Sequence, residues 1–405
     1  MHQTRPTFIR RLAAAAVVAI AGTVAVTAAN AAPAAKAPIV IGAAVDQLGN
    51  MAPVDGPALA AAQLEIKKIN AAGGVLGHPL VMRVCNTQNN KPDVATACAA
   101  NLISHGAKIL WTTCDVDYAA PAVQQGLAKK ILTVSPCIGT DQLGPKRFGP
   151  SGALAFSFGN VAQDEGAAMA EFAVKKMHWK TATVVTDNLL VYFKNVCKAF
   201  SVRFAQLGGK VVEQDSFTQG DKTVGNAASR AAAAKSQVIT FCTAFGDQPT
   251  FVSDVRTLGT NTPILGPWAS DGSFWLPKLK PPLSNVWSVT FASIFGDDPS
   301  KEVRSLVAQL TAEHKAPALA GFLPGADAIA GLAYAIKKAH GSTNGTRLAS
   351  ILAHFHNVKV PSGTISFSPT QHTVFGRLYR VVDTKNGKRH LVATLRASSP
   401  ANIGG

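Results

Sequence analysis

The chain has 405 residues, of which 47% are hydrophobic and only 15% charged, and it carries a formal net charge of +16. This composition excludes a disordered, highly charged chain, and the length suits two domains. The basic residues are scattered, with no cluster in which aromatic side chains alternate with them, so nucleic-acid binding is not expected.

Residues 1–31 have the pattern of a secretory signal peptide. A basic start precedes an apolar, Ala/Val-rich stretch over 12–26, and Ala29 and Ala31 supply the small residues of a cleavage site. The apolar stretch is too short for a stable membrane span. No cysteine stands directly after the cleavage site, so no lipid anchor is expected. We therefore expect a periplasmic or secreted protein.

From residue 38 onward, short apolar runs alternate with helical patterns. The strand candidates are 39–45, 79–85, 108–114, 130–135, 181–187, 210–216, 236–242 and 285–291. Between them, helical spacing of apolar residues predicts helices over 59–71, 93–108 and 164–180, the last two capped by Asp93 and Asp164. This α/β alternation occurs twice, over 38–155 and 160–290, and predicts two doubly wound parallel sheets.

The remainder of the chain changes character twice. Residues 300–357 have helical patterns, whereas 363–368 and 375–395 are rich in strand-forming residues. Asn386-Gly387, at the centre of a four-residue turn over 385–388, predicts a β-hairpin at the carboxyl end.

The sequence lacks the usual nucleotide and catalytic motifs. GxGxxG after the first strand, GxxxxGK[ST], HExxH and GxSxG are all missing. His354 and His356 form an HxH pair, but no third ligand follows nearby, and the six cysteines contain no CxxC. We therefore expect no cofactor and no metal.

The stretch "ILTVSPCIGTDQL" (131–143) presents polar residues just after a strand. Ser135 or Cys137 could serve as a nucleophile, although no base is evident for either. Alternatively, the loop could hold a small molecule, because ligands of open α/β sheets bind beyond the carboxyl ends of the strands. The stretch "CDVDYAAP" (114–121) follows the preceding strand and occupies an equivalent place.

Several segments together resemble the periplasmic branched-chain amino-acid-binding proteins of ABC transporters, which are type I solute-binding proteins. The resembling segments are "IVIGAAV", "INAAGGVLGHPL", "SPCIGTDQL", "TVVTDNLLVYFKN" and "LGTNTPILGPWASDG". The resemblance implies two doubly wound α/β lobes joined by three chain crossings, with ligand held between the lobes.

The resemblance also implies where the lobes divide. The crossings are expected near 156–162, 290–294 and 360–366. Lobe 1 then comprises 38–157 plus 292–362, and lobe 2 comprises 158–291 plus 363–397.

In the first lobe, the resemblance implies a shelf that receives the ligand's carboxylate. Thr140 matches the family's shelf threonine, with Ile138 and Gly139 as backbone partners. The loop after the third predicted strand usually offers a serine in the family, and that position is Asp115 in this chain. A carboxylate there would repel an incoming carboxylate if it were unpaired.

In the second lobe, the resemblance places aromatic residues at the ligand. Tyr192 matches a ligand-contacting aromatic residue, and Phe245 takes the position of the family's next tyrosine. Trp268 stands where the family has the acidic residue that pairs with the ligand's ammonium, and Asp271 is a candidate substitute. Such a lining suits an apolar or aromatic ligand with a few polar groups.

The expected function is capture of an amino acid or related molecule, with an apolar or aromatic body, and its delivery to an ABC permease. The protein is expected to be a monomer without catalytic activity. Two alternatives remain: a ligand sensor of the same fold that signals to a regulator, and a hydrolase that uses Cys137 or Ser135.

An even number of cysteines in an exported chain favours disulfides, although six cysteines allow fifteen pairings. We expect Cys85–Cys98, which would link a strand end to the next helix, and Cys114–Cys137, at the ends of two neighbouring strands. Cys197–Cys242 is the expected third pair.

Overall fold

The computed structural model describes residues 36–404 except 245 and 274, so the expected signal peptide lies outside the described residues. The described chain forms two α/β lobes, each built on one sheet. Within these residues, no helix combines the length and apolar character needed to cross a membrane.

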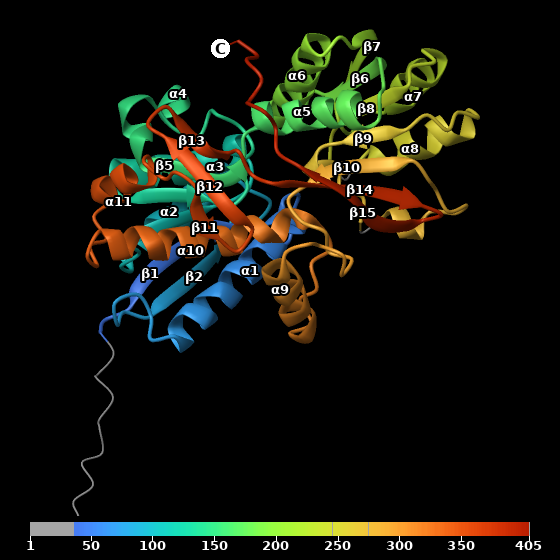
Figure 1. Ribbon diagram of the computed structural model, residues 1–405. Helices are drawn as coiled ribbons and strands as arrows, with labels where there is room; N and C mark the ends of the chain where they lie inside the picture. Colours follow the sequence, from blue (N-terminus) through green and yellow to red (C-terminus); the bar gives the residue numbers. More distant parts are fainter. Residues whose placement is uncertain (1–35, 245, 274, 405) are drawn as a thin grey trace, which may run out of the picture. The chain divides into compact units, whose positions relative to one another are not determined.

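The first lobe begins with five β-strands separated by helices (Figure 1). Its elements are β1 (Ile39–Val45), α1 (Ala52–Ala71), β2 (Leu80–Asn86), α2 (Pro92–Ser104), β3 (Ile109–Thr112), α3 (Val116–Ala128), β4 (Leu132–Ser135), α4 (Pro145–Phe148), η1 (Gly149–Leu154) and β5 (Ala155–Asn160). The first sheet has the order β11-β12-β13-β5-β4-β3-β1-β2, and the strands from β5 to β2 are parallel.

The second lobe repeats the alternation. Its elements are α5 (Ala162–Glu171), η2 (Phe172–Lys176), β6 (Thr181–Asp187), α6 (Val191–Gln206), β7 (Lys210–Phe217), α7 (Val224–Ala233), β8 (Val238–Cys242), α8 (Gln248–Thr257), β9 (Ile264–Gly266), η3 (Trp268–Ser270), η4 (Leu276–Lys278) and β10 (Val286–Thr290). The second sheet has the order β15-β14-β10-β9-β8-β6-β7.

The chain then returns to the first lobe and crosses back once more. These elements are α9 (Lys301–Ala312), η5 (Ala320–Phe322), α10 (Leu323–Lys338), α11 (Gly345–Leu352), β11 (Val358–Val360), β12 (Gly363–Ser368), β13 (Gln371–Phe375), β14 (Tyr379–Lys385) and β15 (Lys388–Leu395). Helix α10 packs along α1, far away in sequence, and Figure 1 shows the two side by side.

Most strand predictions are confirmed, and the ranges predicted for β1 and β6 match the observed bounds. The carboxyl-terminal hairpin is also confirmed, because β14 pairs antiparallel with β15 around Asn386-Gly387. Both turn residues have positive φ, at 50° and 73°, as a two-residue hairpin turn requires. Strands β5, β9, β11 and β13 were absent from the predicted set; β9 and β11 have only three residues each.

The third crossing lies elsewhere than expected. Residues 363–397 were assigned to the second lobe, but β12 and β13 pair in the first sheet, with β13 parallel to β5. The hairpin stays there because Phe367 packs edge-on against Phe156 and Phe158 in the core of the first lobe. The chain therefore crosses between β13 and β14, at residues 376–378.

The expected helix caps at Asp93 and Asp164 are wrong. Helix α2 begins after Lys91 with Pro92 in its first turn, and α5 begins after Val161. Proline suits the first helical position because that position needs no N–H donor. Asp164 instead uses its carboxylate to accept hydrogen bonds from Tyr379 Oη (3.1 Å) and Gly376 N (3.2 Å), both next to the third crossing.

The three expected disulfides are present. Cys85–Cys98 joins β2 to α2, and Cys197–Cys242 joins α6 to β8. Cys114–Cys137 joins the loops after β3 and β4, which leave the same sheet edge because the two strands pair in parallel. No described cysteine is free.

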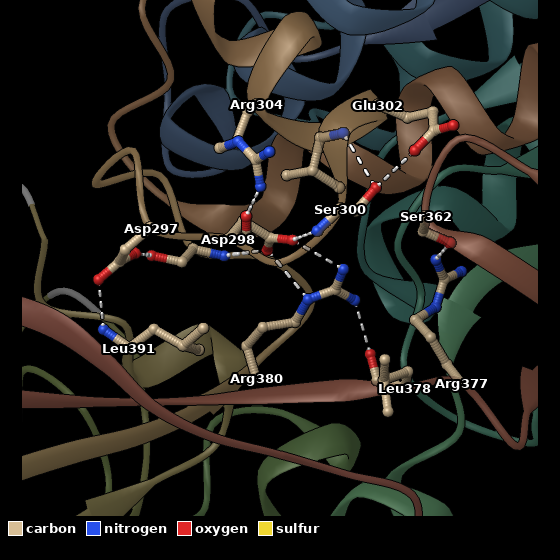
Figure 2. A network of polar contacts seen from close by, with 12 residues as sticks. Asp297, Asp298, Ser300, Glu302, Arg304, Ser362, Arg377, Leu378, Arg380 and Leu391 are labelled. Atoms are coloured by element: carbon tan, nitrogen blue, oxygen red, sulfur yellow. Dashed lines mark hydrogen bonds and ion pairs between the residues drawn. The ribbon is translucent and has the colours of Figure 1, made fainter.

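Two buried arginines hold the third crossing. The guanidinium of Arg377 donates to Asn160 Oδ1 (2.6 Å) and to the Phe158 carbonyl (2.7 Å), both at the first crossing. It also bonds Asp327 of α10 and Ser362. Arg380 donates twice to Asp298, at 2.9 and 3.0 Å, which ties the third crossing to the second (Figure 2). The three crossings thus form one hydrogen-bonded unit.

Candidate functional site

A small cavity of about 50 Å³ lies where the loops after β3 and β4 meet the second lobe. The first lobe contributes Met51, Val54 and the loop residues 114–115 and 137–140. The second lobe contributes Leu190, Tyr192, Phe193, Ala244, Trp268 and Ala269. Small-molecule sites usually have volumes on the order of 300–1,000 Å³, so the lobes close tightly around this one.

The hydroxyl groups of two serines hold the loop after β4 in place. Ser135 Oγ donates to the Thr113 carbonyl (2.9 Å) and accepts from the N–H groups of Cys137 (3.4 Å) and Ile138 (3.3 Å). Ser157 Oγ donates to the Ile138 carbonyl at 2.7 Å. These bonds fix the loop that carries the predicted shelf residues.

The shelf residues Gly139 and Thr140 face the second lobe directly. A Cβ atom at Gly139 would lie only 2.5 Å from Cδ2 of the Tyr192 ring, so the ring packs on the glycine backbone. Thr140 Oγ1 accepts hydrogen bonds from Asn195 Nδ2 (3.4 Å) and from Gln142 N (3.3 Å). The shelf therefore makes a direct contact with the second lobe.

Asp115 caps helix α3. Its Oδ1 atom accepts hydrogen bonds from the backbone N–H groups of Asp117 (2.9 Å) and Tyr118 (3.1 Å). The side chain is only 4% exposed, and burial raises its pKa to about 6 against the lowering effect of the hydrogen bond from Tyr118 N. Aspartate is among the best residues for this position, which explains how a carboxylate is accommodated beside the cavity.

Two aromatic residues that line the cavity, Tyr192 and Trp268, are hydrogen-bonded to a residue that the sequence analysis did not identify. Glu165, on α5 and fully buried, accepts hydrogen bonds from Tyr192 Oη and from Trp268 N, both at 2.7 Å. Burial raises its pKa to about 8. The rings of Tyr192 and Trp268 lie 6.2 Å apart, centroid to centroid. One buried carboxyl group thus positions both aromatic side chains.

A second missed carboxylate organises the first lobe. Asp55 on α1 accepts from Thr113 Oγ1 (2.6 Å), Cys114 N (3.0 Å) and Asp46 N (2.9 Å). It therefore joins the loop after β1 to the loop after β3, which carries Asp115. Asp55 and Glu165 both sit inside helices, where no local pattern distinguishes them from surface acids.

Of the eight predicted binding residues, six line the cavity, one lies outside the described residues and one is placed elsewhere. The six are Asp115, Ile138, Gly139, Thr140, Tyr192 and Trp268. Phe245 lies outside the described residues. Asp271 is not among the described lining residues: its carboxylate accepts from Ala320 N (3.1 Å) and faces Arg389 at 3.4 Å. Because this charge is already paired within the protein, Asp271 is not placed to substitute for the acid missing at 268.

Comparison with protein families decides what kind of molecule this is. Residues 38–388 match the family described as "Periplasmic binding protein", which accounts for most of the chain. The chain belongs to this family. The two-lobed fold and the cavity between the lobes agree with that membership.

Two curated relatives of this periplasmic binding protein are distant. "Leu/Ile/Val-binding protein BraC3" of Rhizobium johnstonii is 23% identical over 331 residues, which cover 80% of this chain and 87% of the relative. "Leu/Ile/Val-binding protein homolog 3" of Brucella melitensis is 24% identical over 203 residues, covering 48% of this chain. That match spans about half of the Brucella relative, 53% of its length.

Solved structures share the fold of the periplasmic binding protein at similarly low identity. The substrate-binding protein LivJ of Streptococcus pneumoniae, in complex with isoleucine, is 19% identical with a TM-score of 0.75, covering 89% of this chain and 99% of that one. A solute-binding protein of Rhodopseudomonas palustris BisB5, in complex with 3,4-dihydroxybenzoic acid, is 18% identical with a TM-score of 0.75, covering 90% and 98%.

The two nucleophile candidates are engaged in structural contacts in this periplasmic binding protein. Cys137 is bonded to Cys114, so it has no thiol to activate. The Ser135 hydroxyl donates to the Thr113 carbonyl, and no described histidine or carboxylate is within hydrogen-bond reach of it. This arrangement removes the two residues on which the hydrolase alternative depended.

The buried carboxyl groups predict that the periplasmic binding protein is less stable at higher pH. Burial raises the pKa values of Glu165 to about 8, Asp55 to about 7, and Asp115 and Asp164 to about 6. Each native carboxyl therefore holds its proton at a pH where the unfolded chain has released it, so stability is lost as pH rises through these values. We expect the melting temperature to fall by about 5 °C between pH 5 and pH 8.

The Glu165→Gln variant tests whether Glu165 causes the loss of stability near pH 8. The amide can still accept from Trp268 N and can donate to the Tyr192 hydroxyl, but it does not titrate. Thermal melts followed by circular dichroism at constant ionic strength should show a flatter profile between pH 6.5 and 8 for the variant. An unchanged slope in that interval would show that Glu165 does not titrate there.

Proposed function

We propose that this chain is an exported solute-binding protein that captures a small molecule between its lobes and delivers it to an ABC permease. The observation that carries the proposal is the cavity itself, which both lobes line and which a family of periplasmic binding proteins would use for ligand. The cavity lies beyond the carboxyl ends of β3 and β4, where open α/β sheets bind ligands. The signal-peptide pattern of residues 1–31 supports export.

Ligand entry requires the lobes to separate. A volume of about 50 Å³ has room for little more than a water molecule or two, whereas an amino acid is several times larger. Opening would break the Thr140–Asn195 hydrogen bond and lift Tyr192 from Gly139, while the three crossings stay joined. Closure around a bound molecule is the hinge motion by which such proteins would signal occupancy to a permease.

The lining favours a ligand with an apolar body. Met51, Val54, Leu190 and Phe193 provide apolar surface in the proposed site. We propose that Asp115, Ile138, Gly139, Thr140, Tyr192 and Trp268 contact the ligand. Relatives with this fold include proteins crystallised with isoleucine and with 3,4-dihydroxybenzoic acid, both small molecules with an apolar portion.

A thermal-shift screen of amino acids, their amides, small amines and aromatic acids tests the proposal. A compound present at 100 times its Kd stabilises the folded protein by about 2.7 kcal/mol, because it binds the native state and not the unfolded chain. We expect at least one compound to raise the melting temperature by about 5 °C. If no small metabolite shifts the melting point, the solute-binding proposal fails.

A further inference from the structure

The charge of the cavity lining has one sign. Among the described lining residues, Asp115 is the one carboxylate, and none is lysine, arginine or histidine. Tyr192 is the other ionisable side chain, and burial raises its pKa well above its usual value, so its phenol stays neutral. The pKa of about 6 at Asp115 leaves this carboxyl largely ionised at neutral pH. A ligand therefore meets a net negative site.

One oxygen of Asp115 remains available to a ligand. Both capping hydrogen bonds go to Oδ1, and Oδ2 accepts none from the described residues. Arg147, whose charge also acts on Asp115, donates to Asp117 Oδ1 at 2.6 Å and makes no hydrogen bond with Asp115. A side chain that is 96% buried, with an unused acceptor beside a cavity, favours a ligand that donates to it.

Four backbone donors of the first lobe that could hold an anion are already used, which leaves the indole N–H of Trp268 as a lining donor without a described partner. Helix α3 begins at the cavity, but Asp115 occupies the N–H groups of Asp117 and Tyr118 at its amino terminus. On the neighbouring loop, Ser135 accepts from the N–H groups of Cys137 and Ile138. A ligand carboxylate placed here would lack these donors and would face the charge of Asp115, which costs binding energy.

The opposite wall suits a cation. Tyr192, Phe193 and Trp268 line the cavity from the second lobe, with ring centroids 5.6 Å apart for Tyr192 and Phe193. Aromatic faces attract ammonium groups and also pack against apolar chains. A carboxylate on one side and aromatic rings on the other therefore complement a molecule that has a cationic head and an apolar body.

We propose that the ligand is a small organic cation, an apolar amine whose ammonium group donates to Asp115 Oδ2 and whose body packs against the aromatic residues of the second lobe. This inference rests on the solute-binding function proposed above and specifies the ligand class. It differs from what the resemblance implies, which is a carboxylate received at this shelf.

Three matched compounds test which charged group of an amino acid, the carboxylate or the ammonium, the site binds. Leucine carries both charges, 3-methylbutylamine lacks the carboxylate, and 4-methylpentanoate lacks the ammonium. Each is titrated calorimetrically into the wild-type protein, Asp115→Asn and Asp117→Asn. Asparagine caps a helix as well as aspartate does, so the first variant removes the charge and keeps the cap. Asp117, on the same turn and outside the described lining, provides the control.

We expect 3-methylbutylamine to bind the wild-type protein more tightly than the other two probes. Asp115→Asn should weaken it by about tenfold or more, since a hydrogen bond to a charged group is lost, and Asp117→Asn should change it less than threefold. Tightest binding of leucine or 4-methylpentanoate, or an Asp115→Asn variant that binds the amine equally well, would overturn the cation proposal and leave the solute-binding function standing. If no compound of the wider screen binds either, both proposals fail.

Discussion

Replacing Arg377 with methionine is expected to lower the free energy of unfolding by about 3–5 kcal/mol. Arg377 is fully buried in the third crossing and bonds Asn160 and the Phe158 carbonyl of the first. Its guanidinium also pairs with Asp327, which is itself fully buried on α10. Methionine fills much of the same space but leaves the Asp327 carboxylate without its cationic partner, and burial of an unpaired charge is costly.

The measurement is urea unfolding followed by circular dichroism, with two companion variants. Arg83→Met changes an exposed arginine whose guanidinium, among the described residues, bonds the His105 carbonyl, and its effect should stay within about 0.5 kcal/mol. Arg377→Met combined with Asp327→Asn removes the unpaired charge but keeps an acceptor for Ser362 N, so part of the lost stability should return. A loss below about 1 kcal/mol for Arg377→Met would show that the buried ion pair does not stabilise the crossings.

Replacing Gly139 with valine is expected to weaken ligand binding by about 100-fold. A Cβ atom at this position would lie 2.5 and 2.6 Å from two carbons of the Tyr192 ring, and the valine methyl groups extend further. Tyr192 cannot move away freely because its hydroxyl bonds Glu165 at 2.7 Å. Since overpacking costs about 1–3 kcal/mol, the penalty falls on the closed, ligand-holding arrangement of the lobes.

Titration of the best compound from the thermal-shift screen measures the loss in affinity, and small-angle scattering measures closure. The wild-type radius of gyration should fall when ligand is added, whereas that of Gly139→Val should stay constant. Gly56→Ala on α1 is the control, because no atom lies within 4 Å of a Cβ at that position, and its affinity should match the wild type. Undiminished binding by Gly139→Val would mean that Tyr192 and Gly139 need not meet when ligand is held.

Asp115 and Asp271 differ in whether their carboxylate oxygens already have partners within the protein. Both are acids near the site, but Asp271 faces Arg389 and Ala320 N, whereas Asp115 keeps one oxygen without a described partner. Their surroundings, and not their residue type, decide which of them is available to a ligand.

The amino-acid sequence alone was enough to predict the parts of the fold that depend on neighbours in the chain. Apolar runs long enough to be buried predicted β1 and β6 with their observed bounds, and Asn386-Gly387 predicted the final hairpin. The disulfides followed from the order of strands and helices, since parallel neighbours such as β3 and β4 bring Cys114 and Cys137 to one edge. The family motifs then pointed to six of the fourteen described residues that line the cavity.

Which side chains keep a free hydrogen-bonding group depends on contacts between distant parts of the chain. The third crossing lies at 376–378, and not at the expected place, because Phe367 packs against Phe156 and Phe158 of the first lobe. These partners lie more than 200 residues earlier in the chain. Glu165 accepts hydrogen bonds from both Tyr192 and Trp268, and Trp268 lies 103 residues after Glu165 in the chain. Burial and long-range pairing set the charge and the hydrogen-bonding capacity of a side chain, and local sequence patterns carry no record of either.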